Sequence, residues 1–163
     1  MTNARPRLAN AEMTANGLSD IYSSPPIPAI DIAEENGVNV LFVDFGKNAE
    51  TVSGLVDFPN ARLYVNRNDY LERQIFTVAH ELGHWLLHKD FYEADPERYN
   101  VLPRFSNPYR DDPLEQEANR FAASLLVPKR LLVPVLHAPV STLSEIFLVN
   151  RAIMERRIKD VRK

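Results

Sequence analysis

Residues 69–88 read DYLERQIFTVAHELGHWLLH, a run in which apolar side chains recur at helical spacing. The pattern predicts an amphipathic helix from Asp69 to His88, with Asp69 and Glu72 forming a capping box at its start. The residues expected to face the core are Leu71, Ile75, Val78, Ala79, Leu82 and Leu86. Polar residues, Thr77 and the histidines among them, fall on the other side. We therefore expect a polar stripe that points away from the main core.

This helix carries an H-E-x-x-H motif at His80, Glu81 and His84. Residues four apart lie on one helix face, so both imidazoles can bind the same metal ion. Glu81 shares that face and can act as a general base toward a water molecule. The motif alone arises by chance in about one chain of this length in a few hundred, and a solvated helix face that happens to carry histidines is the alternative. Gly83 lowers helix stability, which indicates that another segment approaches closely here.

A catalytic zinc site needs a third protein ligand and one open coordination position. His88 lies eight residues after His80, a rise of about 12 Å, which is too far for one ion. His137 lies between two prolines and is expected to be a surface or packing residue. The third ligand must therefore come from another part of the chain.

A second helix is predicted in the sequence DDPLEQEANRFAASLLVP, with Asp112 as N-cap, Pro113 as its first residue and Pro128 at its end. Its expected buried stripe consists of Leu114, Ala118, Phe121, Ala122 and Leu125.

Glu115 and Asn119 are four residues apart on this helix and point together. Glu115 would supply the third ligand, and Asn119 would hydrogen-bond the outer nitrogen of a ligating histidine. Two alternatives stay open. Glu115 could instead close a capping box with Asp112. Glu117 could be the ligand, although it lies about 200° around the helix from Glu115, and we expect it to point to solvent.

The two helical segments, RQIFTVAHELGHWLLH at 73–88 and EQEANRFAASLLVP at 115–128, resemble the ImmA/IrrE family of bacterial zinc metallopeptidases. The similarity spans about residues 25–160 and is weaker outside these helices. Near the C-terminus, VNRAIMERRI matches the family pattern loosely, with Asn150 in place of the usual serine. Both residues are good N-caps.

The resemblance implies a small zincin-like metallopeptidase domain. In it, His80, His84 and Glu115 bind Zn²⁺, Asn119 supports a ligand, and Glu81 is the general base. It also implies a narrow substrate, since family members commonly act on a helix-turn-helix repressor. The chain shows no helix-turn-helix segment of its own, so DNA binding would belong to that partner.

Composition agrees with a small intracellular enzyme. The 163 residues predict a single domain at 1–163, with an N-terminal helix and linker at about 1–24 and a helical segment at 141–163. The absence of cysteine excludes disulfides and thiolate ligands. No export signal or membrane span is recognisable, so we expect a cytoplasmic protein without membrane contact.

A net charge of −3 argues against direct nucleic-acid binding. The exception is a basic C-terminal cluster, interpreted as a solvated helix end. Its members are Arg151, Arg156, Arg157, Lys159, Arg162 and Lys163.

The remaining elements predict an α+β fold, mainly helical with a three-stranded sheet. Helices are expected at about Leu8–Tyr22 and Ala29–Glu35. A buried strand is expected at Val38–Phe45, and a hairpin at Thr51–Phe58 and Ala61–Arg67.

Between the two metal helices we expect a long, proline-broken loop. It would serve as a lid or substrate-facing wall, or be only a surface insertion, and one of its tyrosines could stabilise an oxyanion. Its aromatic residues are Phe91, Tyr92, Tyr99, Phe105 and Tyr109.

Two functions follow as hypotheses. The first is zinc-dependent hydrolysis of a peptide bond in a specific protein, with Glu81 as base. The second is a toxin or regulatory binding protein that forms a complex with a helix-turn-helix antitoxin. A purely structural zinc site is disfavoured, because a closed site would not need Glu81.

Overall fold

The computed structural model describes residues 5–99, 101–105 and 112–163, with side chains for all of these except 98–105. The helices are α1 (Leu8–Ser19), α2 (Ala29–Glu35), α3 (Leu71–Leu87), α4 (Lys89–Ala94), α5 (Pro96–Tyr99), α6 (Pro113–Leu126), α7 (Lys129–Leu132), α8 (Val140–Phe147) and α9 (Arg151–Val161). The strands are β1 (Asn39–Val43), β2 (Val52–Asp57), β3 (Arg62–Asn66) and β4 (Val101–Phe105), and short 3-10 helices occur at Gly46–Asn48 and Val133–Val135.

The strands form one mixed sheet in the order β1-β3-β2-β4. β1 runs parallel to β3, whereas β2 is antiparallel to both β3 and β4. The predicted β2–β3 hairpin is present, and Asn60 in its turn donates hydrogen bonds to the carboxylate of Asp57. The α+β prediction is confirmed. The three expected strands are joined by β4, which lies in the segment expected to be a loop.

The prediction that β1 is a buried strand is wrong. β1 lies at an edge of the sheet and is paired only with β3 among the described strands. Leu41 and Phe42 are exposed there. The apolar run is the same in an edge strand and a central strand, because the strand order is set by pairings that the local sequence does not encode.

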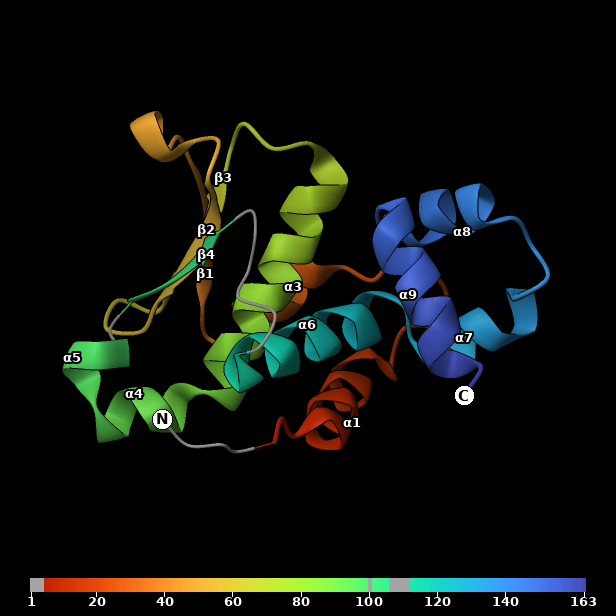
Figure 1. Cartoon of the computed structure of the whole chain (residues 1–163), viewed down its shortest axis with the longest axis horizontal. Helices are drawn as coiled ribbons and strands as arrows, with labels where there is room; N and C mark the ends of the chain where they lie inside the picture. The colour runs from red at the N-terminus through yellow and green to blue at the C-terminus, as the bar shows by residue number, and fades with distance from the viewer. Residues whose placement is uncertain (1–4, 100, 106–111) are drawn as a thin grey trace.

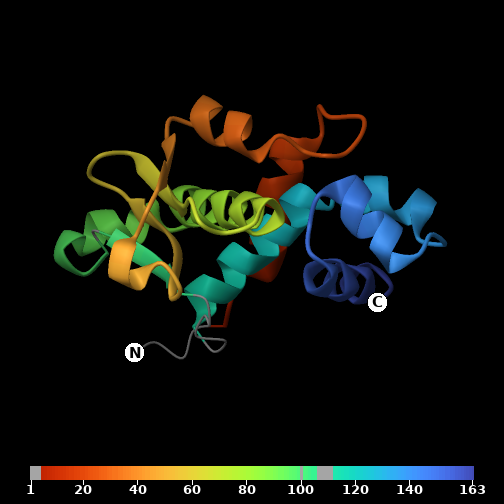
Figure 2. The ribbon, with the colours of Figure 1, turned by 90° about the horizontal axis from the view of Figure 1, so that it is seen from above.

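Helix α3 lies between the sheet and α6 (Figures 1 and 2). Its apolar face joins the buried cluster of Val56, Leu63, Val65, Val78 and Leu82. The approach to the sheet is closest at Gly54, where a Cβ atom would stand 2.5 Å from the Thr77 methyl and 2.6 Å from the Tyr64 carbonyl oxygen. Only glycine allows this spacing between β2 and α3.

The start of α3 differs from the prediction. Tyr70 is the N-cap and makes no side-chain capping bond, so the expected capping box of Asp69 and Glu72 is not formed. Asp69 instead pairs with Arg73 at 3.4 Å. Arg73 also donates to the hydroxyl of Ser53 in β2, which ties the helix start to the sheet.

Helix α6 begins as predicted. The side chain of Asp112 accepts a hydrogen bond from the backbone N–H of Leu114 at 2.8 Å, and Pro113 occupies the first turn. Of the expected buried stripe, Leu114 is only half-buried, while Ala118, Phe121, Ala122 and Leu125 are fully buried. The N-terminal helix α1 packs along α6 on the side away from the sheet (Figure 1).

The C-terminal helices form a separate group beyond the end of α6 (Figure 2). Asn150 caps α9 as predicted and accepts a hydrogen bond from the N–H of Ile153. Arg157 is not part of a solvated basic surface, because its residue is only 1% exposed. It donates to the Val127 carbonyl and pairs with Glu12, which joins α9 to the α6–α7 junction and to α1.

The described residues between α3 and α6 include α4, α5 and β4, where the sequence predicts a loop. Tyr92 stacks on Phe58 with ring centroids 5.3 Å apart, and Phe91 lies edge-on to His88. Tyr109 and the side chains of Tyr99 and Phe105 lie outside the described residues. In the part of the chain that the structure describes, no helix has the length and apolarity that crossing a membrane requires.

Candidate metal centre

Three side chains from α3 and α6 converge on one point. The Nε2 atom of His84 lies 2.7 Å from Oε1 of Glu115, and Nε2 of His80 lies 3.0 Å from Oε2 of the same carboxylate. One candidate ligand atom from each residue lies within 4.8 Å of the others. The structure thus brings together the three residues that the sequence suggested as ligands.

This donor set fits zinc. Two imidazole nitrogens and a carboxylate are the His₂Glu combination of catalytic zinc sites, and ligand atoms around a tetrahedral zinc lie about 3.3 Å apart. The observed spacings are slightly shorter, as expected where a hydrogen bond joins the atoms that an ion would otherwise separate. In the described part of the chain, no other group of three such side chains meets the same distance criterion.

Close packing of the two helices makes the convergence possible. A Cβ atom on Gly83 would stand 3.0 Å from Cδ1 of Phe121 and 3.3 Å from the Cα of Ala118. The expectation that Gly83 marks a close approach is confirmed.

Asn119 makes the hydrogen bond expected of it. Its Oδ1 atom lies 2.8 Å from Nδ1 of His80. An amide oxygen can only accept, so Nδ1 of His80 carries a hydrogen, and Nε2 is the nitrogen that can donate to Glu115 when His80 is protonated or bind an ion when it is neutral.

The sequence suggested that the polar face of α3 points away from the core, and this expectation is wrong. Thr77, His80, Glu81, His84 and His88 are all buried, covered by α6 on one side and by the sheet on the other. The pattern of apolar residues predicts the face of α3 that packs on the core. It does not predict that the polar face is covered as well, because the cover is α6, which begins at residue 113.

Glu117 does not point to solvent either. It is 3% exposed, and its Oε2 atom lies 2.9 Å from Nε2 of His88. His88 stays outside the ligand group, as its position along α3 predicted, but its Nδ1 atom lies 2.7 Å from Nδ1 of His84. The sequence signal for this contact was available, because His88 follows His84 by four residues on the same helix face.

The charges of the cluster reinforce one another. Burial would raise the pKa of Glu115, but hydrogen bonds and the charges of His80 and His84 outweigh it and hold this pKa far below its ordinary value. Burial opposes protonation of His84, yet Glu115 and the charge of Glu81 raise the pKa of His84 above its ordinary value. In the metal-free protein a proton therefore provides the positive charge that this site favours.

Comparison with known proteins identifies the family. Residues 33–159 match the peptidase M78 family, described as the IrrE N-terminal-like domain. The chain belongs to this family. The match includes α3 and α6 entirely and most of the C-terminal helical group, but not α1.

Among solved structures, this IrrE-like chain is similar to a Mycobacterium tuberculosis transcriptional regulator, with 16% identity and a TM-score of 0.66. The similarity covers 91% of this chain and 46% of that one, so the IrrE-like chain corresponds to less than half of the regulator. At this identity the likeness shows the fold alone. A search of curated proteins gives no match.

Proposed function

We propose that this protein is a zinc-dependent endopeptidase, with all of residues 1–163 forming one metallopeptidase domain. The observation that carries the proposal is the convergence of His80, His84 and Glu115, with Glu81 buried on the same helix. Family membership supports the assignment. The expected cytoplasmic location rests on the sequence alone.

Bound zinc would act as a Lewis acid that polarises the scissile carbonyl and makes a water molecule more acidic. His80, His84 and Glu115 would hold the ion and leave one position open. Glu81 would take a proton from the attacking water, whose oxygen bonds to the carbonyl carbon, and pass that proton to the leaving nitrogen as the C–N bond breaks. Burial of Glu81 keeps this proton transfer away from bulk solvent.

The proposed substrate is a helix-turn-helix repressor. The resemblance to the ImmA/IrrE family motivates this choice. The structural similarity to a protein named as a transcriptional regulator agrees with it, although only at the level of the fold.

The test combines metal analysis with a proteolysis assay. Purified protein should contain close to one zinc per chain, and it should cleave a helix-turn-helix repressor encoded beside its gene. Glu81→Gln should keep the metal and abolish cleavage, because an amide cannot act as the base. The matched control is His137→Ala, since His137 is exposed and outside the site. Absence of metal, or cleavage by Glu81→Gln at the parental rate, would refute the proposal.

The complex-forming alternative makes a different prediction in the same assay. If neither the parental protein nor Glu81→Gln cleaves the repressor, but both bind it tightly, the protein is a toxin-like or regulatory binding partner. Intact-mass spectrometry of the mixture, together with size-exclusion chromatography, separates the two outcomes.

A further inference from the structure

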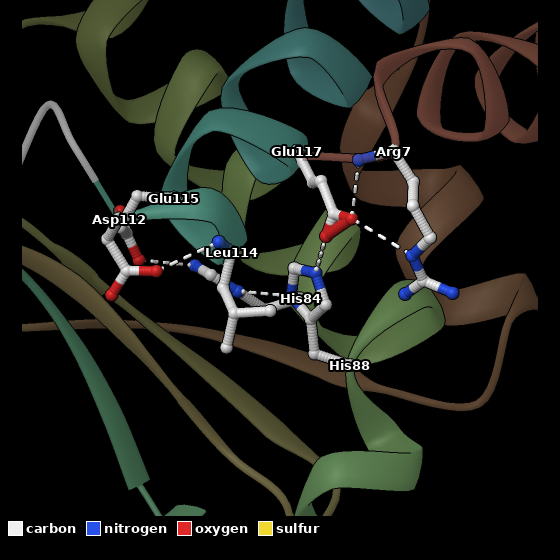
Figure 3. Close-up of polar contacts among 7 residues, drawn as sticks. All are labelled: Arg7, His84, His88, Asp112, Leu114, Glu115 and Glu117. Carbon is white, nitrogen blue, oxygen red and sulfur yellow. Dashed lines mark hydrogen bonds and ion pairs between the residues drawn. The ribbon is translucent and has the colours of Figure 1, made fainter. Parts of the chain in front are cut away.

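A buried chain of hydrogen bonds leads from His84 to the N-terminal segment. Nδ1 of His84 lies 2.7 Å from Nδ1 of His88, and Nε2 of His88 lies 2.9 Å from Oε2 of Glu117. The other oxygen of Glu117 accepts from the backbone N–H of Arg7 at 2.9 Å and from its Nε at 3.1 Å. Figure 3 shows Glu117 between Arg7 and His88, with His84 next in line.

The chemistry of these groups fixes the direction of every hydrogen bond in the chain. A carboxylate only accepts, so Nε2 of a neutral His88 carries the hydrogen and donates to Glu117. Nδ1 of His88 is then an acceptor, and Nδ1 of His84 must donate to it. Nε2 of His84 is then the nitrogen that donates to Glu115 while His84 is protonated, and the one that offers a lone pair to an ion once that proton has left.

His88 can fill this role only as a neutral imidazole that donates to Glu117 through Nε2. A protonated His88 would have hydrogens on both nitrogens and could not accept from His84.

The arrangement parallels that of the other motif histidine. His80 donates through Nδ1 to Asn119 and presents Nε2 to Glu115. His84 does the same through His88. The difference is that an amide oxygen accepts without further support, whereas His88 accepts only in the tautomer that Glu117 selects.

We propose that His88, Glu117 and Arg7 are positioning residues that hold His84 in its metal-binding tautomer, so that the N-terminal segment completes the metal site. The proposal rests on the proposed function, in that His84 is taken as a metal ligand. Arg7 precedes the region matched by the family, residues 33–159. This contact therefore comes from outside the residues that match the family.

The decisive variant is Glu117→Gln, which keeps size and shape. The carboxylate serves His88 with one oxygen and Arg7 with the other. A glutamine has one oxygen and one NH₂ group, so it must present a donor to Arg7 or to His88. Because Arg7 donates twice, the oxygen should face Arg7 and the NH₂ group should face His88, which then changes tautomer and can no longer accept from His84. Zinc affinity, measured by competition with a chromophoric chelator, should fall by about 10–100-fold.

A second substitution separates positioning from simple damage to the fold. His88→Gln places an amide oxygen near Nδ1 of His84, and this acceptor does not depend on Glu117. His88→Gln should therefore keep zinc affinity within a few-fold, whereas His88→Leu should lose about as much as Glu117→Gln. In the His88→Gln background, adding Glu117→Gln should have little further effect. If Glu117→Gln does not fold, the zinc affinities of His88→Gln and His88→Leu still test whether His84 needs an acceptor at position 88.

A readout without metal completes the test. Imidazole ¹⁵N–¹H correlation spectra of the metal-free protein should show the hydrogen of His88 on Nε2 in the parental chain, where it is donated to Glu117. The hydrogen should shift toward Nδ1 in Glu117→Gln. Arg7→Ala, which retains the backbone N–H, should have a smaller effect, and Arg5→Ala, an exposed arginine in the same segment, should have none.

Unchanged zinc affinity and unchanged His88 nitrogens in Glu117→Gln would overturn the positioning role while leaving the metal site intact. If Glu117→Gln lowers zinc affinity equally in the parental chain and in the His88→Gln background, the positioning role is also overturned. The effect of Glu117 would then not pass through His88. If the parental protein binds no zinc, it is the proposed function that fails, and the nitrogen spectra still show whether Glu117 sets the tautomer of His88.

Discussion

Both histidines of the motif present Nε2 to Glu115 and bond to another side chain through Nδ1. For His80 that side chain is Asn119, which makes no other side-chain hydrogen bond among the residues that the structure describes. The contribution of a neighbour that only orients a ligand can therefore be measured most simply at Asn119.

Asn119→Ala should lower zinc affinity by about 10–100-fold with the fold retained, because His80 loses the acceptor that fixes its tautomer. Asn119→Asp is the matched control, since it keeps an acceptor oxygen in place, and it should bind zinc far better than the alanine variant. Chelator competition measures both. Equal affinities of the two variants would show that the hydrogen bond to His80 has no influence on metal binding.

The pH dependence of the metal-free protein follows from His84. Its pKa is raised above the ordinary 6.5, so the stability that comes from its pairing with Glu115 is fully present below pH 6.5 and is lost as the pH rises through the higher folded value. Because that proton must leave for zinc to bind, zinc affinity should keep rising with pH above 6.5.

Urea unfolding of the metal-free protein at several pH values, beside Glu115→Gln, measures the stability change. The free energy of unfolding of the parental protein should exceed that of Glu115→Gln by less as the pH rises. Calorimetric titration with zinc in buffers of different ionisation enthalpy should show release of about one proton near neutral pH. Zinc affinity that stops rising at pH 6.5 would contradict the raised pKa.

At the scale of elements, the site depends on how closely α3 and α6 approach. Gly83→Ala would favour the helix by removing glycine, but its Cβ would press on Phe121 and on the backbone at Ala118. Phe121 is fully buried and has little room to move. We expect the overpacking to dominate and to destabilise the fold by about 1–3 kcal/mol, with weaker zinc binding because the ligands on the two helices move apart.

Gly17→Ala is the matched control. Gly17 also lies inside a helix, α1, but nothing stands within 4 Å of a Cβ atom there. This change should stabilise the protein by about 0.5–1 kcal/mol. Chemical denaturation compares the two variants. A stabilising effect of the same size at both positions would mean that the contact at Gly83 is easily relieved.

The helices of the site could be predicted from the sequence because their signals are local. The spacing of apolar residues and the Asp112–Pro113 start of α6 lie within the segments that they define. The order of the strands and the second cover over α3 could not be predicted in this way. They depend on contacts between segments far apart in the chain. This is why the prediction of a buried strand at β1 is wrong.

The two glutamates of α6 show the same difference between what the local sequence predicts and what depends on distant segments. The helical rotation of about 200° between them correctly separates Glu115, which contacts His80 and His84, from Glu117. The expectation that Glu117 is solvated failed because α1 packs against α6 and brings Arg7 to it. Nothing in the sequence around Glu117 indicates that contact.

For the molecule as a whole, Arg157 joins three regions. It is 1% exposed and bonds to the Val127 carbonyl and to Glu12, so α9 is held to both α6 and α1. Arg157→Ala should destabilise the protein by roughly 2–4 kcal/mol, through lost packing and an acceptor left without its donor.

The adjacent Arg156 provides the control for this prediction. Its side chain is 77% exposed and pairs with Asp160 at 3.7 Å, so Arg156→Ala should change stability by no more than about 0.5 kcal/mol. Thermal unfolding of both variants measures the difference. Similar melting temperatures would mean that the C-terminal group does not contribute to the stability of the rest.

The contact between Arg7 and Glu117 spans 110 residues of sequence. At elongation rates of about 5–20 residues per second, a ribosome needs roughly 5–20 s to synthesise that interval. During this time the N-terminal segment has left the ribosome while the helix that receives it has not been made. The histidine motif is also translated before either glutamate of α6. The nascent chain must therefore carry its histidines without the glutamates of α6 until that helix is made, and the group of His80, His84 and Glu115 is completed only when α6 emerges.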